Sequence, residues 1–237
     1  MAERLWPDGP QLQQAPGVFP LGTDSVLLAD FAAPGNHDRM LDLGTGSGIL
    51  PLLLLWDRPG CSCIGLEISE KACGLARENL QSNGLSGRCS IIQGDLRAHR
   101  SLIAPGSCDL IVSNPPYFPA HAGKQAAGGL ADARSDSSCS LEDLCTAAGW
   151  AIRWGGRFCL VFLPERLPEL IAAMDRQNFA LKRIRPVHHS PGRPVNLLLL
   201  EARKGRKPGL RWEPDLYLRD AAGNETPNVR RIYHRKE

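Results

Sequence analysis

The 237-residue chain lacks any apolar run long enough to cross a membrane. A transmembrane helix needs about 20 consecutive apolar residues. The longest candidate, Ile49 to Trp56, is much shorter and contains Pro51. The first residues, MAERLWPDGPQLQQ, also lack the apolar core and the small-residue cleavage site of a secretory leader. These absences predict a cytoplasmic protein that does not associate with membranes.

The eight cysteines lack the spacing of a disulfide framework or of a zinc site. Cys61 and Cys63 form C-x-C rather than C-x-x-C, and neither a second pair at ligand spacing nor an H-x-x-x-H partner accompanies them. We therefore expect reduced, partly buried thiols and no metal site.

The net charge of +3 is small, but it is unevenly distributed along the chain. Residues 182–237 hold 14 Lys and Arg against 6 Asp and Glu, which gives +8, so the remainder carries −5. A basic C-terminal quarter suggests a surface that faces a polyanion, although a solubilising surface explains the charge equally well.

Apolar residues make up 43% of the chain, which is enough for a core, and strand-like runs alternate with helical stretches. This alternation predicts an α/β fold: a mainly parallel, seven-stranded sheet with helices on both faces. Predicted strands cover residues 40–43, 62–66, 90–93, 110–112, 157–162, 181–186 and 195–202, and predicted helices begin at Ile49 and cover 69–83, 141–154 and 167–176.

The last two strands are joined by VHHSPGRP, a stretch too short for a crossover helix, which predicts an antiparallel hairpin at the sheet edge. The residues before Asp42 show no helical periodicity. We expect a single domain over 1–237, with an N-terminal segment (1–38), a core that binds cofactor and catalyses (39–203) and a basic tail (204–237).

The first strand is followed by LDLGTGSG, in which Asp42 precedes Gly44, Gly46 and Gly48. Glycines allow a tight turn and a close approach of the backbone to a ligand. The spacing D-x-G-x-G-x-G differs from the dinucleotide fingerprint G-x-G-x-x-G, and no G-K-[ST] is present. It resembles motif I of the class I S-adenosylmethionine methyltransferases, in which this loop passes beneath the methionyl part of the cofactor.

Acidic residues follow the next two strands. Glu67 ends the second strand, where a carboxylate can accept hydrogen bonds from both ribose hydroxyls of a nucleotide. Asp95 follows the third strand, and in the family that motif I resembles an acid at this place accepts from the adenine amino group. Each acid alone is better explained by a helix N-cap or a loop charge, but the ordered series at strand ends favours cofactor binding.

The fourth strand runs into Asn114-Pro115-Pro116-Tyr117. The tetrapeptide matches the [DNS]-P-P-[YFW] motif of amino-group methyltransferases. The Asn114 side-chain oxygen and the Pro115 carbonyl could each accept one N–H of a planar amino group and aim its lone pair at the methyl group. The prolines restrict φ and so preorganise both acceptors, and Tyr117 could stack on the substrate ring.

From Gln13 to Tyr233 the chain resembles the bacterial tRNA adenine-N6 methyltransferases of the type that modifies adenine 37 of valine tRNA. The segment GVFPLGTDSVLLADFA resembles the part of that family that covers the cofactor pocket, which implies a cofactor contact at Thr23. The resemblance also implies that Ile68 and Leu96, which follow the two acids, contact S-adenosylmethionine, the cofactor that leaves as S-adenosylhomocysteine.

The resemblance is weaker after the catalytic motif. ADARSD is similar to the family's ARHE segment, so Arg134 matches while Ser135 replaces histidine. In the tail the family's YTEEV is replaced by ETPNV, residues 225–229.

The resemblance implies a tRNA substrate and no obligate protein partner. Compatible features of the tail are two aromatic residues and the cationic side chains of Lys204, Arg206, Lys207 and Arg211, which could contact RNA phosphates.

Other functions remain open from the residues alone. N-P-P-Y also occurs in protein glutamine methyltransferases of the release-factor type, which carry an additional N-terminal helical domain. Guanine N2 or cytosine N4 of ribosomal RNA or DNA is a further acceptor, and an RNA-binding module without catalysis belongs to a different class.

Overall fold

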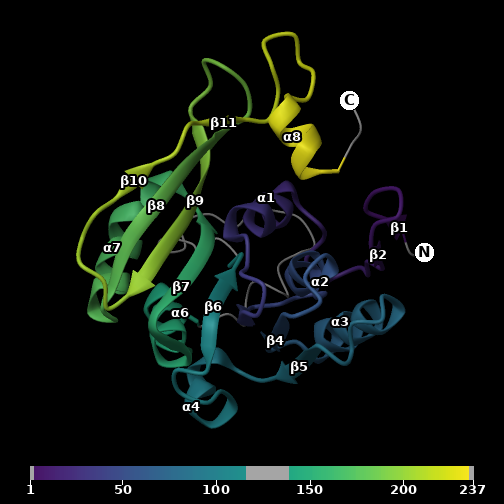
Figure 1. The fold of residues 1–237 in the computed structure, drawn as a ribbon, viewed down its shortest axis with the longest axis vertical. Coiled ribbons are helices and arrows are strands. Elements are labelled where there is room, and N and C mark those ends of the chain that lie inside the picture. Colours follow the sequence, from purple (N-terminus) through teal and green to yellow (C-terminus); the bar gives the residue numbers. More distant parts are fainter. Residues whose placement is uncertain (1–2, 116–138, 235–237) are drawn as a thin grey trace.

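The computed structural model describes residues 3–115 and 139–234, and over these residues a nine-stranded sheet lies at the centre with helices on both faces (Figure 1). The strand order is β10-β8-β9-β7-β6-β3-β4-β5, with β11 also paired to β8. The seven longer strands are β3 (Arg39–Leu43), β4 (Ser62–Glu67), β5 (Cys89–Gln93), β6 (Cys108–Ser113), β7 (Ile152–Phe162), β8 (Phe179–His188) and β9 (Val195–Lys204).

These seven strands confirm the predicted sheet. β3 through β7 pair in parallel, and β9 is antiparallel to both β7 and β8, as expected of an edge hairpin. The sheet exceeds the prediction by two short strands of the basic tail, β10 (Arg211–Trp212) and β11 (Leu216–Tyr217), which run parallel to β8. They cover backbone groups that an edge strand otherwise leaves unpaired.

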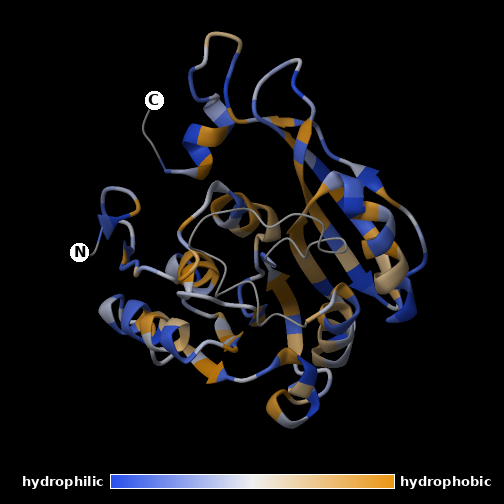
Figure 2. Ribbon diagram, turned by 180° about the vertical axis from the view of Figure 1, so that it is seen from behind, coloured by the Kyte–Doolittle hydropathy of each residue, from blue (hydrophilic) through white to orange (hydrophobic). Residues whose placement is uncertain are grey.

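Each face of the sheet has its own apolar core. One core contains side chains of α1 (Thr23–Ala32), α2 (Ile49–Trp56) and α3 (Glu70–Ser82). The other contains side chains of α6 (Leu141–Ala151) and α7 (Leu167–Arg176), with α4 (His99–Leu102) packed at its margin. Figure 2 shows the apolar residues concentrated on the strands and on the helix sides that face them.

The remaining elements are short. β1 (Glu3–Arg4) and β2 (Gln11–Leu12) form a separate antiparallel pair, and α8 (Pro227–Ile232) packs against α1 near the C-terminus. Single 3-10 turns cover Leu96–Ala98 and Pro164–Arg166.

Side-chain caps define the first residues of two helices. The Ser69 hydroxyl caps α3 by accepting from the Ala72 N–H, at the predicted start of this helix. Ser140 and Asp143 form a reciprocal capping box at the start of α6.

The expectation that no helix precedes Asp42 is wrong, because α1 occupies Thr23–Ala32. Six of its ten residues are buried, since the helix is packed between the sheet, α2 and α8. A helix that is covered on several sides has no polar face and therefore gives no amphipathic period.

The predicted helix over 141–154 is three residues too long. The helix α6 ends at Ala151, and β7 begins at Ile152 and contains the Gly155-Gly156 pair. The pairing of β6 with β7 shifts between Cys108 and Leu110, and Gly155 has a φ of 78°. The glycines therefore accommodate a bulge inside the strand and do not terminate the helix.

Asn79 of α3 and Asn83, the residue that follows this helix, attach the N-terminal segment to the core. Asn79, fully buried, accepts from the Gln13 N–H at 2.7 Å and donates to the Gln13 and Ser47 carbonyls at 3.1 and 2.9 Å. One turn later, Asn83 makes the equivalent pair of bonds to the Gln11 backbone at 2.8 and 2.7 Å. The segment is thereby held beside the glycine loop that contains Ser47.

We expect Asn79→Ala to lower the free energy of unfolding by about 2–3 kcal/mol, because it leaves the buried Ser47 carbonyl and the partly buried backbone groups of Gln13 unpaired. Urea unfolding measures this change. Asn83→Ala is the matched control and should cost less, since its site is more accessible to water. Equal effects of the two substitutions would contradict the role given to Asn79.

Candidate functional site

The candidate site is built from the carboxyl ends of four adjacent strands. β6, β3, β4 and β5 are parallel neighbours in that order, so the residues that follow them gather along one edge of the sheet. In parallel α/β sheets ligands bind at this edge. The structure therefore brings together the motif I loop, Glu67, Asp95 and Asn114, as predicted.

The glycine loop is held by backbone bonds and leaves space above it. The N–H groups of Gly44 and Thr45 donate to the Leu66 carbonyl at 2.9 and 3.1 Å. Gly44, Gly46 and Gly48 all have φ between 55° and 80°, a region that favours glycine. A Cβ on Gly44 or Gly46 would meet no atom within 4 Å, so the loop borders open space on that side.

Asp42 is buried directly beneath this loop. Neither of its carboxylate oxygens has a hydrogen-bond partner among the described residues, and the same is true of the Thr45 and Ser47 hydroxyls. Burial raises the pKa of Asp42 to about 7, the nearby Thr45 hydroxyl opposes this shift, and the charge of Glu67 adds to it. Such unpaired buried groups are costly, and a ligand with a cationic or donor group would satisfy them.

Glu67 lies at the end of β4 and is already engaged with the backbone. Its two oxygens accept from the Gly46 and Ser69 N–H groups, each at 2.9 Å. A carboxylate has about four acceptor positions, so two remain for a ligand. The next residue, Ile68, is a large apolar side chain that is 57% exposed, while Leu96 after β5 is half-buried.

Asp95 has a local role that the sequence also allowed. It caps the 3-10 turn at Leu96 by accepting from the Arg97 N–H at 2.8 Å, and it pairs with the Arg97 guanidinium, which lies 2.9–3.0 Å from both oxygens through Nε. Arg97 lowers the pKa of the Asp95 carboxyl. An adenine amino group would therefore share Asp95 with this arginine.

Asn114 follows β6 and has a defined amide orientation. Its Nδ2 donates to the Ser25 hydroxyl of α1 at 3.0 Å, which leaves Oδ1 as the group that can accept. The preceding Ser113 hydroxyl donates to the Leu43 carbonyl at 2.7 Å and so ties the end of β6 to the start of the glycine loop. Pro115 is buried.

Ser25 is a site residue that sequence reasoning missed. It is 5% exposed and stands in α1, 89 residues before Asn114. The nearby Thr23, which was predicted, is the first residue of the same helix and is half-buried. No motif distance indicates this contact, since it depends on where α1 crosses the end of β6.

The remaining predicted residues are either outside the described part of the chain or away from this edge of the sheet. Pro116, Tyr117 and Arg134 fall outside the described residues. The cationic side chains of the tail are not at this edge of the sheet. The ammonium of Lys204 donates to the Gly149 carbonyl and burial lowers its pKa, so this side chain is turned into the protein. Arg206, Lys207 and Arg211 are exposed.

Taken together, open space over glycines, unpaired buried polar atoms and the exposed Ile68 fit a ligand with both a charged and an apolar part. A family model for the methyltransferase small domain matches residues 11–165, which include every element of this site. The chain belongs to the methyltransferase small domain family.

Curated relatives in the family cover most of the chain. The tRNA1(Val) (adenine(37)-N6)-methyltransferase of Bacteroides thetaiotaomicron is 30% identical over 188 residues, which is 76% of this chain and 75% of the relative. The enzyme of the same name from Proteus mirabilis is 34% identical and covers 76% and 71%.

Solved structures of methyltransferases share the fold. A protein of Agrobacterium tumefaciens, described as a predicted O-methyltransferase, superposes with a TM-score of 0.74, 23% identity, and coverage of 90% of this chain and 96% of that chain. TrmN of Thermus thermophilus gives a TM-score of 0.53 at 25% identity and covers 76% of this chain and 48% of that chain. The architecture is that of class I methyltransferases.

The buried Asp42 predicts a pH-dependent stability. A pKa raised from 3.8 to about 7 means that the folded protein binds a proton more tightly than the unfolded chain. The stabilising contribution is complete below pH 4 and is lost as the pH rises through 7, by at most about 4 kcal/mol.

Urea unfolding at pH 5 and pH 8 measures this loss. Asp42→Asn should show a smaller decrease in the free energy of unfolding between these pH values than the unsubstituted protein. Asp57→Asn, at an exposed carboxylate just after α2, is the control and should leave the decrease unchanged.

Proposed function

We propose that this chain transfers the methyl group of S-adenosylmethionine to the exocyclic N6 of an adenine in tRNA. The observation that carries the proposal is the position of Asn114. Its amide is oriented with Nδ2 toward Ser25 and its oxygen available, at the end of β6 beside the glycine loop of β3.

The first three strand ends would hold the cofactor. Asp42 and the glycine loop suit its charged methionyl part, Glu67 suits the ribose hydroxyls, and Ile68 offers an apolar surface to the adenine ring, with Asp95 and Leu96 beside it. Thr23 at the start of α1 would cover the pocket. When bound, the cofactor supplies an electrophilic methyl group on a sulfonium and leaves as S-adenosylhomocysteine.

The fourth strand end would hold the acceptor. The lone pair of an aromatic amine is delocalised into the ring, so the amine is a poor nucleophile. Two acceptors, Asn114 Oδ1 and the Pro115 carbonyl, would bind its two N–H groups and direct the lone pair out of the ring plane. Catalysis would then come from positioning and preorganised acceptors, with Pro116 and Tyr117 completing the motif.

The tRNA substrate is supported by the relatives, whose names specify adenine 37 of a valine tRNA. Incubation with labelled S-adenosylmethionine and total tRNA, ribosomal RNA or release factor tests it. We expect label in tRNA, and N6-methyladenosine after digestion to nucleosides. Label in release factor, or methylated guanine or cytosine, would overturn the proposal.

Asn114→Ala should lower kcat for tRNA methylation by roughly 10²–10³-fold, because it removes one preorganised acceptor. Calorimetric binding of S-adenosylmethionine should change little, since the cofactor contacts assigned to β3, β4 and β5 remain. Asn228→Ala, at an exposed position of α8, serves as a control with normal activity. Undiminished methylation by the Asn114 variant would refute this role.

Ser25 is a positioning residue in this scheme, because its hydroxyl sets the orientation of the Asn114 amide. Ser25→Ala should lower kcat by about tenfold while KM for S-adenosylmethionine stays the same, and Ser25→Thr, which keeps a hydroxyl, should restore part of the rate. If Ser25 were only structural, the substitution would lower stability and change both kinetic constants or neither. A change in kcat without a change in KM therefore distinguishes the positioning role from a structural one.

A further inference from the structure

The hairpin edge of the sheet carries a pocket that is lined almost entirely by cationic side chains. Its walls come from β8, β9, β10 and the turn after β9. The lining residues are Lys182, Arg183, Glu201, Arg203, Arg206 and Arg211. Five of these six side chains are basic, so the pocket favours an anion.

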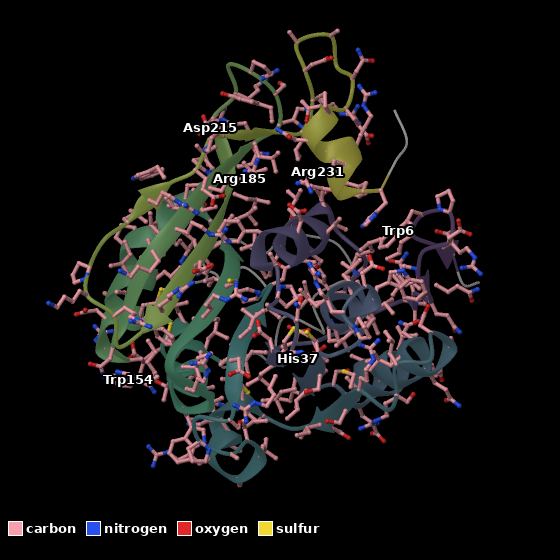
Figure 3. All side chains as sticks on the ribbon, in the orientation of Figure 1. Trp6, His37, Trp154, Arg185, Asp215 and Arg231 are labelled. Carbon is pink, nitrogen blue, oxygen red and sulfur yellow. The ribbon has the colours of Figure 1, made fainter. Side chains whose placement is uncertain are left out.

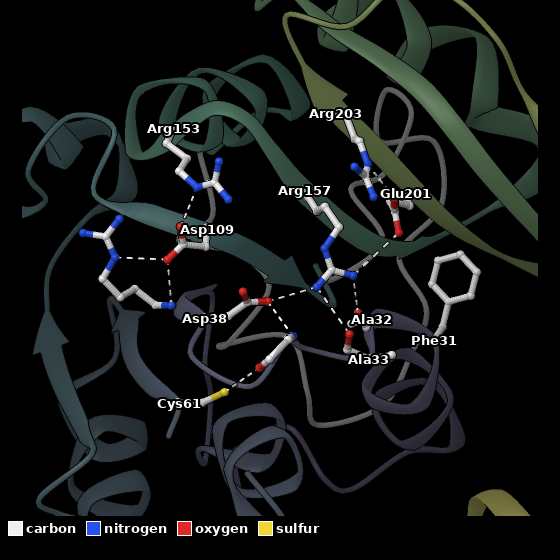
Figure 4. A network of polar contacts seen from close by, with 12 residues as sticks. Phe31, Ala32, Ala33, Asp38, Cys61, Asp109, Arg153, Arg157, Glu201 and Arg203 are labelled. Carbon is white, nitrogen blue, oxygen red and sulfur yellow. Dashed lines mark hydrogen bonds and ion pairs between the residues drawn. The ribbon is translucent and has the colours of Figure 1, made fainter. Parts of the chain in front are cut away.

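The carboxylates nearby do not neutralise this charge. Glu201, 5% exposed, is shared by three arginines: Arg203 and Arg183 lie 3.1 and 3.3 Å away, and Arg157 lies at 3.8 Å. Figure 4 shows Arg157 and Arg203 beside Glu201. Arg183 and Arg211 share Glu213, at 3.3 and 3.1 Å, and Arg157 also pairs with Asp38. The five basic lining residues and Arg157 thus face three carboxylates, which leaves a net charge of +3.

The strand register places like charges opposite each other. Arg183 is the direct neighbour of Arg211 in the β8–β10 pair, and Arg157 is the direct neighbour of Arg203 in the β7–β9 pair. Like charges at opposed positions of a sheet are destabilising. An anion bound between these paired arginines would offset this cost.

Two of the lining residues reach out into solvent. Arg211 has 71% of its side chain exposed, and Arg206 is exposed above Gly155 in the bulge of β7. Among the described residues no acidic side chain pairs with Arg206 or Lys182.

Two exposed indoles stand close to this region along the chain. Trp212, next to Arg211, is 62% exposed, and Trp154, next to the bulge, is 66% exposed. Figure 3 places Trp154 far from Asp215 and Arg231, which lie toward the opposite end of the molecule. Cationic groups interleaved with exposed aromatic rings are typical of surfaces that bind nucleic acid backbones.

The pocket is separate from the catalytic edge. The lining strands β9, β8 and β10 lie two, three and four strands away from β6, which at about 4.8 Å per strand is roughly 10–19 Å. In the strand register, Leu110 of β6 pairs with Arg157 of β7, and Arg157 pairs with Arg203 of β9. Arg203 is therefore aligned with the middle of β6 and not with its carboxyl end. A ligand in the pocket therefore cannot also be the group held by Asn114.

We propose that this pocket binds phosphodiester groups of the substrate RNA outside the loop that presents the target adenine. This inference rests on the proposed function, since it assigns a second contact surface to the same tRNA. Arg206, Arg211 and Lys182 would contact phosphates without reading sequence, whereas Arg183 and Arg203 would hold the site together through Glu201.

The double variant Arg206→Gln/Arg211→Gln tests the pocket while leaving the buried Glu201 cluster intact. The matched control is Arg100→Gln/Arg176→Gln, which removes the same charge from α4 and α7. The Kd for total bacterial tRNA is measured by filter binding over a range of salt concentrations. Calorimetric binding of S-adenosylmethionine checks that both variants keep the folded cofactor site.

We expect the double variant to bind tRNA more weakly. The slope of log K against log salt should become less negative by about 1.4–1.8, the value for two lost phosphate contacts. The control should keep the slope of the unsubstituted protein. An unchanged slope in the double variant would overturn the inference, and so would an equal reduction in both variants.

The two proposals fail in different ways. If the unsubstituted protein binds tRNA with the expected slope but produces no N6-methyladenosine, the proposed function fails and the pocket stands. If tRNA is methylated normally by the double variant and its slope is unchanged, the pocket inference alone fails.

Discussion

The parallel pairing of β3 with β4 and β6 is the constraint on which the rest of the structure depends. In this register Asp42 lies opposite Gly65 on one side and Val112 on the other, so three strand ends meet at one level. A Cβ on Gly65 would come within 3 Å of Thr45 and Ile91, and its absence makes room for the glycine loop. The Ser113–Leu43 hydrogen bond then holds the end of β6 to the same edge.

The site keeps buried polar groups that folding alone does not satisfy. Asp42, Thr45 and Ser47 lie beneath the glycine loop with unpaired side-chain oxygens among the described residues. Leaving such groups unpaired costs free energy. The surrounding structure supplies compensation through well-paired anchors such as Asn79, which fastens both the N-terminal segment and the Ser47 carbonyl to α3.

The helix α1 connects the two surfaces that we assign to the RNA. Near its N-terminus Ser25 sets the amide of Asn114, while at its C-terminus the Ala32 and Phe31 carbonyls accept from Arg157 and Arg183 at 2.8 and 2.6 Å. Cations at a helix C-terminus stabilise the exposed carbonyls. Both arginines therefore secure α1, and Arg183 also lines the basic pocket.

The sequence by itself determined the parallel sheet, the edge hairpin and the order of groups at the strand ends, because strands, glycine turns and proline breaks are local signals. It misjudged α1, whose buried surroundings remove the amphipathic period, and the Gly155-Gly156 pair, whose bulge depends on the neighbouring strand β6. It also grouped Lys204 with Arg206 and Arg211 by proximity along the chain.

Only the tertiary structure decided that Lys204 turns inward, that the strand of Arg211 lies four strands from β6, and that Ser25 orients the Asn114 amide. These are contacts between segments far apart along the chain. Their geometry is set by how helices cross strands and by how strands align, which no spacing within a motif encodes.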